Sequence, residues 1–133
     1  MSWQSYIENL EKSSDAVTGA AIVSLADGSV WAKSDSFQAS AAQLQTLVAY
    51  YGQDADINKA AEKGVDIEKT HFVVPRVDGN LIFGMKNDSG LFAIKTKQTV
   101  LVLLFTGDRD SGKPAECRAA IERMAEYLEG SNY

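Results

Sequence analysis

The sequence predicts an α/β fold of the α+β type, in which a central antiparallel sheet of about six strands lies between layers of helices. Apolar residues recur at helical spacing near both ends of the chain. In the second half, strand-like segments are joined by short turns, which favour antiparallel neighbours. The segment TVLVLLF (99–105) is apolar on both alternating faces. We therefore expect a strand that is covered on both sides.

The first third of the chain predicts a helix followed by a β-hairpin. Ser2 is a suitable N-cap for the opening helix. The segment 16–34 then changes to strand character, and its Asp27-Gly28 pair predicts a tight hairpin turn, because such turns need positive φ angles. The apolar face of the opening helix repeats at i, i+3, i+4 and i+7 and consists of Trp3, Tyr6, Ile7 and Leu10.

Two shorter helices and four strands are expected next. The helices occupy 38–52 and 56–64, and their predicted ends are Gly52 and Gly64. Asp56 is the expected cap of the second helix. From Lys69 onward, apolar runs alternate with turns, and Pro75 should lie at an edge or a bulge because it cannot donate to a ladder.

A last helix is expected to begin near Pro114, which suits a first helical turn. Its inward stripe consists of Cys117, Ile121, Met124, Ala125 and Leu128. At about 100° per residue, Tyr127 lies on the flank of that stripe, half in and half out. Gly130 is positioned to end this helix.

Composition narrows the class of protein. The 133 residues are 45% hydrophobic and are expected to form one domain (1–133) without a signal peptide or a spanning helix. A single cysteine, Cys117, excludes an internal disulfide and suggests a reducing, cytoplasmic setting. The net charge of −5 argues against non-specific nucleic-acid binding.

Catalytic and metal-binding patterns are absent from the sequence. His71 is the only histidine, so no His/Cys metal-ligand spacing exists and no cofactor is implied. The segment GMKNDSG (84–90) matches neither common glycine-rich phosphate motif and is better explained as a hairpin turn. The sequence therefore gives no support for an enzyme.

Aromatic residues gather at the two ends of the chain. Trp3 and Tyr6 are near the start, Tyr127 and Tyr133 near the end, and Trp31 is on an early strand. Chain ends often lie close together, so these rings could converge on a groove for a polyproline II ligand. The alternative is that the rings only seal the terminal helices onto the sheet.

At these residues the chain resembles profilin, the small actin-monomer-binding protein. The resemblance runs from end to end through SWQSYI, DGSVWA, KTKQTVLVLLF, AEYL and the closing Tyr133. It implies terminal helices on one face of the sheet and two shorter helices on the other. It also implies a groove for proline-rich proteins such as formins, lined by Trp3, Tyr6, Trp31, Tyr127, Leu128 and Tyr133.

The resemblance further implies a second face that binds monomeric actin. Residues 69–133 carry nine Lys/Arg against eight Asp/Glu, which suits an acidic partner. A register error of one residue would turn strand side chains to the other face. The matching positions are Lys69, Phe72, Val74, Arg76, Lys86, Lys95, Lys113, Arg118 and Arg123.

The function that this resemblance implies is regulation of actin polymerisation and of nucleotide exchange on actin, by a monomer in the cytoplasm and cytoskeleton. One alternative is a regulator that binds phosphoinositides or anionic membrane surfaces through the same basic residues. Met85 precedes Lys86 where many profilins have consecutive basic residues, which weakens that alternative. Another is a small ligand-sensing domain, which would need a closed pocket with convergent polar groups.

Overall fold

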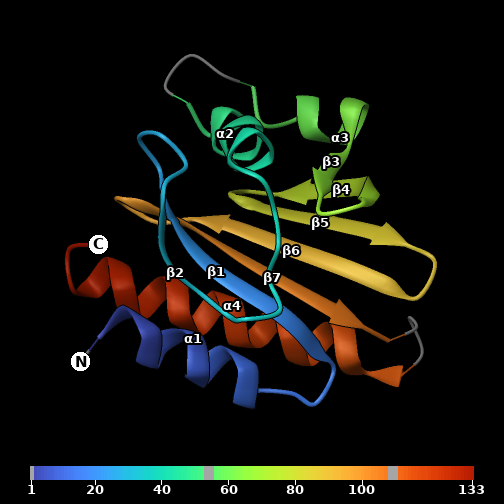
Figure 1. The fold of residues 1–133 in the computed structure, drawn as a ribbon. Coiled ribbons are helices and arrows are strands. Elements are labelled where there is room, and N and C mark those ends of the chain that lie inside the picture. Colours follow the sequence, from blue (N-terminus) through green and yellow to red (C-terminus); the bar gives the residue numbers. More distant parts are fainter. Residues whose placement is uncertain (1, 53–55, 108–110) are drawn as a thin grey trace.

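The computed structural model describes residues 2–52, 56–107 and 111–133, which form one sheet flanked by helices (Figure 1). In chain order the elements are α1 (Trp3–Lys12), β1 (Val17–Ser24), β2 (Val30–Lys33), α2 (Ala41–Ala49), α3 (Lys59–Lys63), β3 (Val65–Ile67), β4 (Thr70–Asp78), β5 (Leu81–Lys86), β6 (Ser89–Lys95), β7 (Thr99–Thr106) and α4 (Lys113–Gly130).

The described residues form a seven-stranded sheet in the order β2-β1-β7-β6-β5-β4-β3, and every pair is antiparallel. The predicted fold class is confirmed, with one strand more than expected. The additional strand is β3, whose three residues are too few to show an alternating pattern. It pairs with β4 through Val65–Phe72 and Ile67–Thr70.

Helices cover the sheet on both faces, as the apolar β7 segment predicts. The helices α1 and α4 run along one face, and α2 and α3 lie on the other (Figure 1). The central strand β7 supplies both cores. Leu101, Leu103 and Phe105 pack toward α1 and α4, whereas Val100 and Val102 pack toward α2.

Local signals fix most element boundaries. Ser2 caps α1 by accepting a hydrogen bond from Ser5 N at 3.3 Å, and Ser40 forms a capping box with Gln43 at the start of α2. Gly28 has a φ of 78° in the β1–β2 turn, as predicted. Pro114 lies in the first turn of α4.

Two of the predicted helix boundaries are wrong. The helix α2 ends at Ala49 with Tyr50 as its C-cap, so Gly52 lies beyond the helix. The helix α3 begins at Lys59 after Asn58, and the Asp56 carboxylate instead accepts from Asn58 N at 3.0 Å in the preceding turn.

Pro75 interrupts the pairing of β4 with β5, as its missing N–H requires. The register is Val73 opposite Met85 and then Arg76 opposite Phe83, so β4 carries an extra residue between these pairs. This bulge reverses the alternation of side chains along β4. It decides which β4 residues reach the surface on the α4 side.

Candidate functional site

Five aromatic rings from three distant parts of the chain meet beside α1. The indole of Trp3 is central, with ring centroids 4.9 Å from Trp31, 4.9 Å from Tyr133 and 5.5 Å from Tyr6. Tyr127 continues the row at 5.8 Å from Tyr6. All four contacts are edge to face, a favourable geometry for aromatic pairs. We call Trp3, Tyr6, Trp31, Tyr127 and Tyr133 the aromatic platform.

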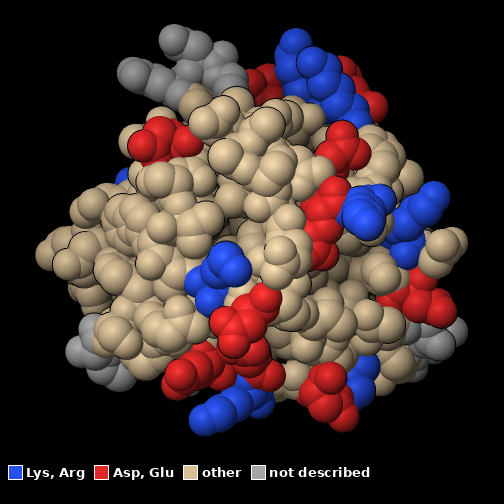
Figure 2. Space-filling model, in the orientation of Figure 1, with Lys and Arg blue, Asp and Glu red and all other residues tan. Residues whose placement is uncertain are grey.

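The platform faces solvent instead of being sealed inside the fold. Tyr127 is 51% exposed and Tyr133 is 41% exposed, while the other three rings are half-buried. In Figure 2 the part of the surface around the two chain ends is largely without charged residues. The prediction that Leu128 lines the groove is wrong, because this side chain is fully buried in the core beneath the platform. It supports the rings and has no surface to offer a ligand.

Three hydrogen bonds hold the backbone of Tyr133 and so position its ring. Tyr133 N donates to the Leu128 carbonyl at 2.8 Å, beyond the end of α4. The Tyr133 carbonyl accepts from Gln98 N at 2.6 Å and from Thr96 Oγ1 at 2.7 Å, both in the β6–β7 turn. No sequence motif predicts this role for Thr96 and Gln98. These contacts can be recognised only in the folded structure, where the β6–β7 turn lies next to the end of the chain.

The surroundings of Tyr6 shift the pKa of its hydroxyl. Desolvation first, and then a side-chain hydrogen bond with Tyr127, raise the pKa of Tyr6 above its ordinary value of 10.0. Tyr6 therefore keeps its proton near neutral pH. A ligand that offers carbonyl oxygens would compete with Tyr127 for this proton.

A pocket of about 230 Å³ adjoins the platform between α1 and α4. It shares Tyr6 and Tyr127 with the platform and contains one predicted actin-binding residue, Arg123. The structure thus places Arg123 on the α1 side of α4, apart from the β4 residues of that predicted set. The described lining residues are Tyr6, Asn9, Ala120, Arg123, Met124 and Tyr127.

The structure brings together only part of the predicted actin-binding set. Two of its members, Phe72 and Val74, are not on the surface. Phe72 and Val74 are each 3% exposed and pack in the core under α2. Between them, Val73 is 58% exposed. The prediction failed by one residue of register, the error that strand alternation makes possible.

Two more predicted cations lie on the α2 side of the sheet. Lys69 lines a hollow with Gln38 and Ser40, and Lys95 lines another with Tyr50 and Tyr51. Both are therefore separated from the face that α4 crosses. They do not join the other predicted residues in one patch.

Arg76 and Arg118 are brought together by a shared carboxylate. Asp78 Oδ2 lies 3.0 Å from Arg118 Nη1 and 3.2 Å from Arg76 Nε. Arg118 Nε also lies 2.7 Å from a Glu122 oxygen, and this hydrogen bond is the main reason that the pKa of Arg118 is raised. The charge of the two arginines is largely balanced within the protein.

Apolar side chains border this cluster. Val73 pairs with Met85 and Arg76 pairs with Phe83 across β4 and β5, so these side chains share one face of the sheet. Phe83 and Met85 are half-buried, and α4 packs mainly against β6 and β7. We call Val73, Arg76, Phe83, Met85 and Arg118 the β4–β5 face. Sequence reasoning missed Val73 and Phe83, and it is the Pro75 bulge that puts Val73 on the same face as Arg76.

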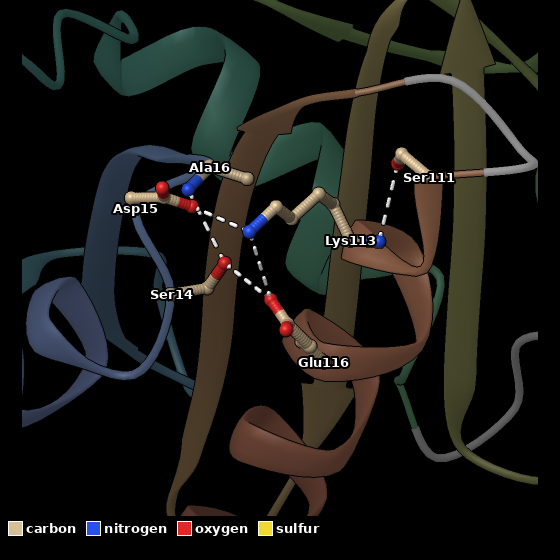
Figure 3. Close-up of polar contacts among 6 residues, drawn as sticks. All are labelled: Ser14, Asp15, Ala16, Ser111, Lys113 and Glu116. Carbon is tan, nitrogen blue, oxygen red and sulfur yellow. Dashed lines mark hydrogen bonds and ion pairs between the residues drawn. The ribbon is translucent and has the colours of Figure 1, made fainter.

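Lys113, at the start of α4, is tied to the α1–β1 loop (Figure 3). Its Nζ lies 2.7 Å from Asp15 Oδ1 and 3.6 Å from Glu116 Oε2, and the Asp15 contact is the main reason that the pKa of Lys113 is raised. Ser14 Oγ donates to the same Glu116 oxygen at 2.9 Å. Lys86 is exposed at the end of β5.

The residues that could bind a metal or act as a thiol nucleophile are few in the described part of the chain. No group of three or more His, Cys, Asp or Glu residues in this part of the chain is placed to hold a metal ion. His71 and Asp66 form an exposed pair, with Nδ1 of His71 2.6 Å from Oδ1 of Asp66. Burial raises the pKa of the Cys117 thiol, which disfavours the nucleophilic thiolate. None of the described helices is long and apolar enough to cross a membrane.

Comparison with known proteins gives a consistent result over the whole chain. A family model described as Profilin matches residues 1–133. Profilin-1 of Caenorhabditis elegans is 40% identical over an alignment of 134 positions that covers 98% of this chain and 98% of that one. The solved structure of Acanthamoeba castellanii profilin IA superposes with a TM-score of 0.84 at 32% identity, covering 99% of this chain and 100% of that one.

Two more distant structures share the fold and hold partners. Mouse profilin IIa, in complex with a double repeat from the FH1 domain of mDia1, matches with a TM-score of 0.69 at 21% identity and covers 100% of both chains. A profilin named LokiProfilin2, in complex with rabbit actin, matches with a TM-score of 0.75 at 12% identity and covers 98% of both chains. The family model and the identity to profilins over nearly the full length show that this chain belongs to the profilin family.

Proposed function

We propose that this protein binds proline-rich segments on the aromatic platform. The observation that carries this proposal is the row of rings Trp31, Trp3, Tyr6 and Tyr127, drawn from β2, α1 and α4 and open to solvent. A polyproline II segment offers apolar ridges and carbonyl acceptors and is already rigid. Flat rings with a donor at the tip suit both features.

The length of the row sets the length of ligand. Successive centroids are 4.9, 5.5 and 5.8 Å apart, so the row spans at most about 16 Å. A polyproline II helix rises about 3.1 Å per residue, so roughly five prolines cover it. The related mouse profilin IIa is bound to a formin-type FH1 repeat, which is consistent with a ligand of this chemistry.

We also propose that monomeric actin binds the β4–β5 face. Val73, Phe83 and Met85 offer an apolar centre, and Arg76 and Arg118 lie at its border. An apolar centre with a polar rim is the usual arrangement of a protein interface. The complex of LokiProfilin2 with rabbit actin shows an actin partner for this fold.

The two proposed surfaces use different elements. The platform is built from α1, β2 and the end of α4, and the β4–β5 face from β4, β5 and the first half of α4. In this proposal the protein can therefore bind both partners at the same time. Profilins are actin-binding regulators and not enzymes. In this proposal the protein acts in the cytoplasm at the actin cytoskeleton, where it regulates polymerisation and nucleotide exchange on actin.

One experiment tests both proposals by measuring whether two variants each lose one ligand and keep the other. Oligoproline and monomeric actin are each titrated calorimetrically into the parent, Tyr127→Ala and Val73→Asp. Tyr127→Ala should weaken oligoproline binding by about 1–3 kcal/mol and leave actin binding unchanged. Val73→Asp should weaken actin binding only. If the parent and Tyr127→Ala bind oligoproline equally well, the platform proposal is wrong. If the parent and Val73→Asp bind actin equally well, the proposal for the β4–β5 face is wrong.

The phosphoinositide alternative has weaker support from the geometry. Arg118 and Lys113 are engaged by carboxylates, and Lys69 and Lys95 lie on the other side of the sheet. Headgroup binding favours a contiguous set of cations. Sedimentation with vesicles that contain or lack phosphoinositide separates this alternative from actin binding.

A further inference from the structure

The pocket between α1 and α4 continues the aromatic platform at one end. Tyr6 and Tyr127 form the last ring pair of the row and also line the pocket. A ligand that lies along the row therefore passes from rings onto this pocket without leaving the surface. Because Tyr127 ends the row, a residue that directly flanks a proline run over the rings lies next to the other lining residues of the pocket, among them Asn9 and Arg123.

The polar groups of the pocket differ from those of the platform. Of the described residues that line it, Arg123 alone carries a charge, and Asn9 offers an amide. Ala120 and Met124 complete the lining with apolar atoms. The pocket thus combines hydrogen-bond donors with an apolar lining, whereas the platform consists of aromatic rings.

The guanidinium of Arg123 is available to a ligand. In the part of the chain that the structure describes, Arg123 makes no ion pair within 4.0 Å, although Glu126 lies one turn further along α4. The other arginine of α4 differs, because Arg118 is engaged by Asp78 and Glu122. Among the described residues, no carboxylate therefore engages the Arg123 guanidinium, whereas two engage that of Arg118.

We propose that Arg123, with Asn9, selects proline-rich segments in which an acidic side chain flanks the proline run. This inference rests on the proposed function of the platform and deepens it. The carboxylate of an Asp or Glu would accept from the guanidinium, a pairing that neutral or basic flanking residues cannot make. The proline run supplies the affinity, and the Arg123 pocket supplies the discrimination between flanking sequences.

The test uses calorimetry at low salt with four peptides of eight prolines that carry one Glu or one Gln at either end, and with the untailed peptide as reference. The parent should bind a Glu-tailed peptide about two- to fivefold tighter than its Gln-tailed match, the range of exposed ion pairs. Arg123→Gln should abolish this preference while binding the untailed peptide as the parent does. Arg118→Gln is the matched control and should keep the preference.

Each outcome decides between the proposals. No preference for Glu in the parent, or a preference that survives in Arg123→Gln, overturns the role of Arg123 while oligoproline binding stands. If the untailed peptide does not bind the parent, the platform proposal fails and this inference falls with it. A preference that disappears in both Arg123→Gln and Arg118→Gln would reflect overall charge and would also overturn the assignment.

Discussion

The indole of Trp3 and the phenol ring of Tyr133 lie edge to face at 88°, with their centroids 4.9 Å apart, although they come from opposite ends of the described chain. The contact joins the first turn of α1 to the residues that follow α4. Because Trp3 also touches Trp31 and Tyr6, one residue links three segments. The candidate groove therefore depends on long-range packing and not on any local motif.

Removing the Tyr133 ring should separate binding from stability. The ring is 41% exposed, so Tyr133→Ala should leave the free energy of unfolding within about 1 kcal/mol of the parent. Oligoproline binding should weaken by about 1–3 kcal/mol, because an exposed anchor is lost. Tyr133→Phe keeps the ring and should retain most of the affinity. Calorimetry and urea denaturation measure the two quantities, and unchanged affinity in Tyr133→Ala would exclude this ring from the site.

Two neighbouring residues on α4, Tyr127 and Leu128, should differ strongly in their effect on stability. Leu128 is fully buried, so Leu128→Ala should lower the free energy of unfolding by about 2–5 kcal/mol through lost contacts and a cavity. Tyr127 is 51% exposed, and Tyr127→Ala should change stability far less. Urea denaturation of both variants gives the comparison. Similar destabilisation by both would contradict the division between a supporting layer and a binding layer.

Much of the fold was predictable because its signals are local or periodic. The two-sided apolar pattern of 99–105 predicted the buried central strand, and Asp27-Gly28 predicted the first hairpin. The platform residues were also predictable, because Trp3 and Tyr6 stand at helical spacing, Trp31 follows the Asp27-Gly28 turn, and Tyr127 and Tyr133 lie near the other end of the chain. Their convergence was expected because chain ends often lie close together, and the resemblance to profilins then favoured a groove over simple packing.

The second surface was less predictable, for a physical reason. Phe72 and Val74 were placed on the surface, but β4 turns them inward, and the Pro75 bulge then brings Val73 and Arg76 to one face. A bulge shifts every later side chain on its strand, and the sequence shows only that Pro75 permits one. The ion pairs of Arg118 and Lys113 likewise join residues far apart in the chain.

Gly90 should be a position that tolerates no side chain. A Cβ atom there would overlap the ring of Phe105, which is 1% exposed and stacks on Phe92 with ring centroids 5.3 Å apart. Gly90→Ala should therefore lower the free energy of unfolding by about 1–3 kcal/mol or more, through overpacking. Gly130→Ala is the control, since a Cβ there meets no atom within 4 Å, and it should be neutral or slightly stabilising in a helix. Thermal denaturation of both variants tests this, and equal melting temperatures would contradict it.

The ion pair between Asp15 and Lys113 should make stability depend on pH at the acid end. The hydrogen bond from Lys113 lowers the pKa of Asp15 below its ordinary value of 3.8. Between the folded and unfolded pKa values the unfolded chain binds more protons, so the stabilisation is complete above pH 3.8 and is lost as the pH falls through the folded value. Asp15→Asn should be less stable than the parent near neutral pH, with a difference that shrinks in acid.

A double-mutant cycle isolates this contact from the rest of the network. Lys113→Gln should reproduce the loss of acid dependence seen in Asp15→Asn, and the double variant should add little, because both remove the same 2.7 Å contact. The effect should decrease at high salt, since both groups are accessible to solvent. Urea denaturation between pH 7 and pH 2 at two salt concentrations provides the measurement. Fully additive single effects would show that Asp15 and Lys113 act on stability independently, and the bridge from the α1–β1 loop to α4 would then have no energetic role.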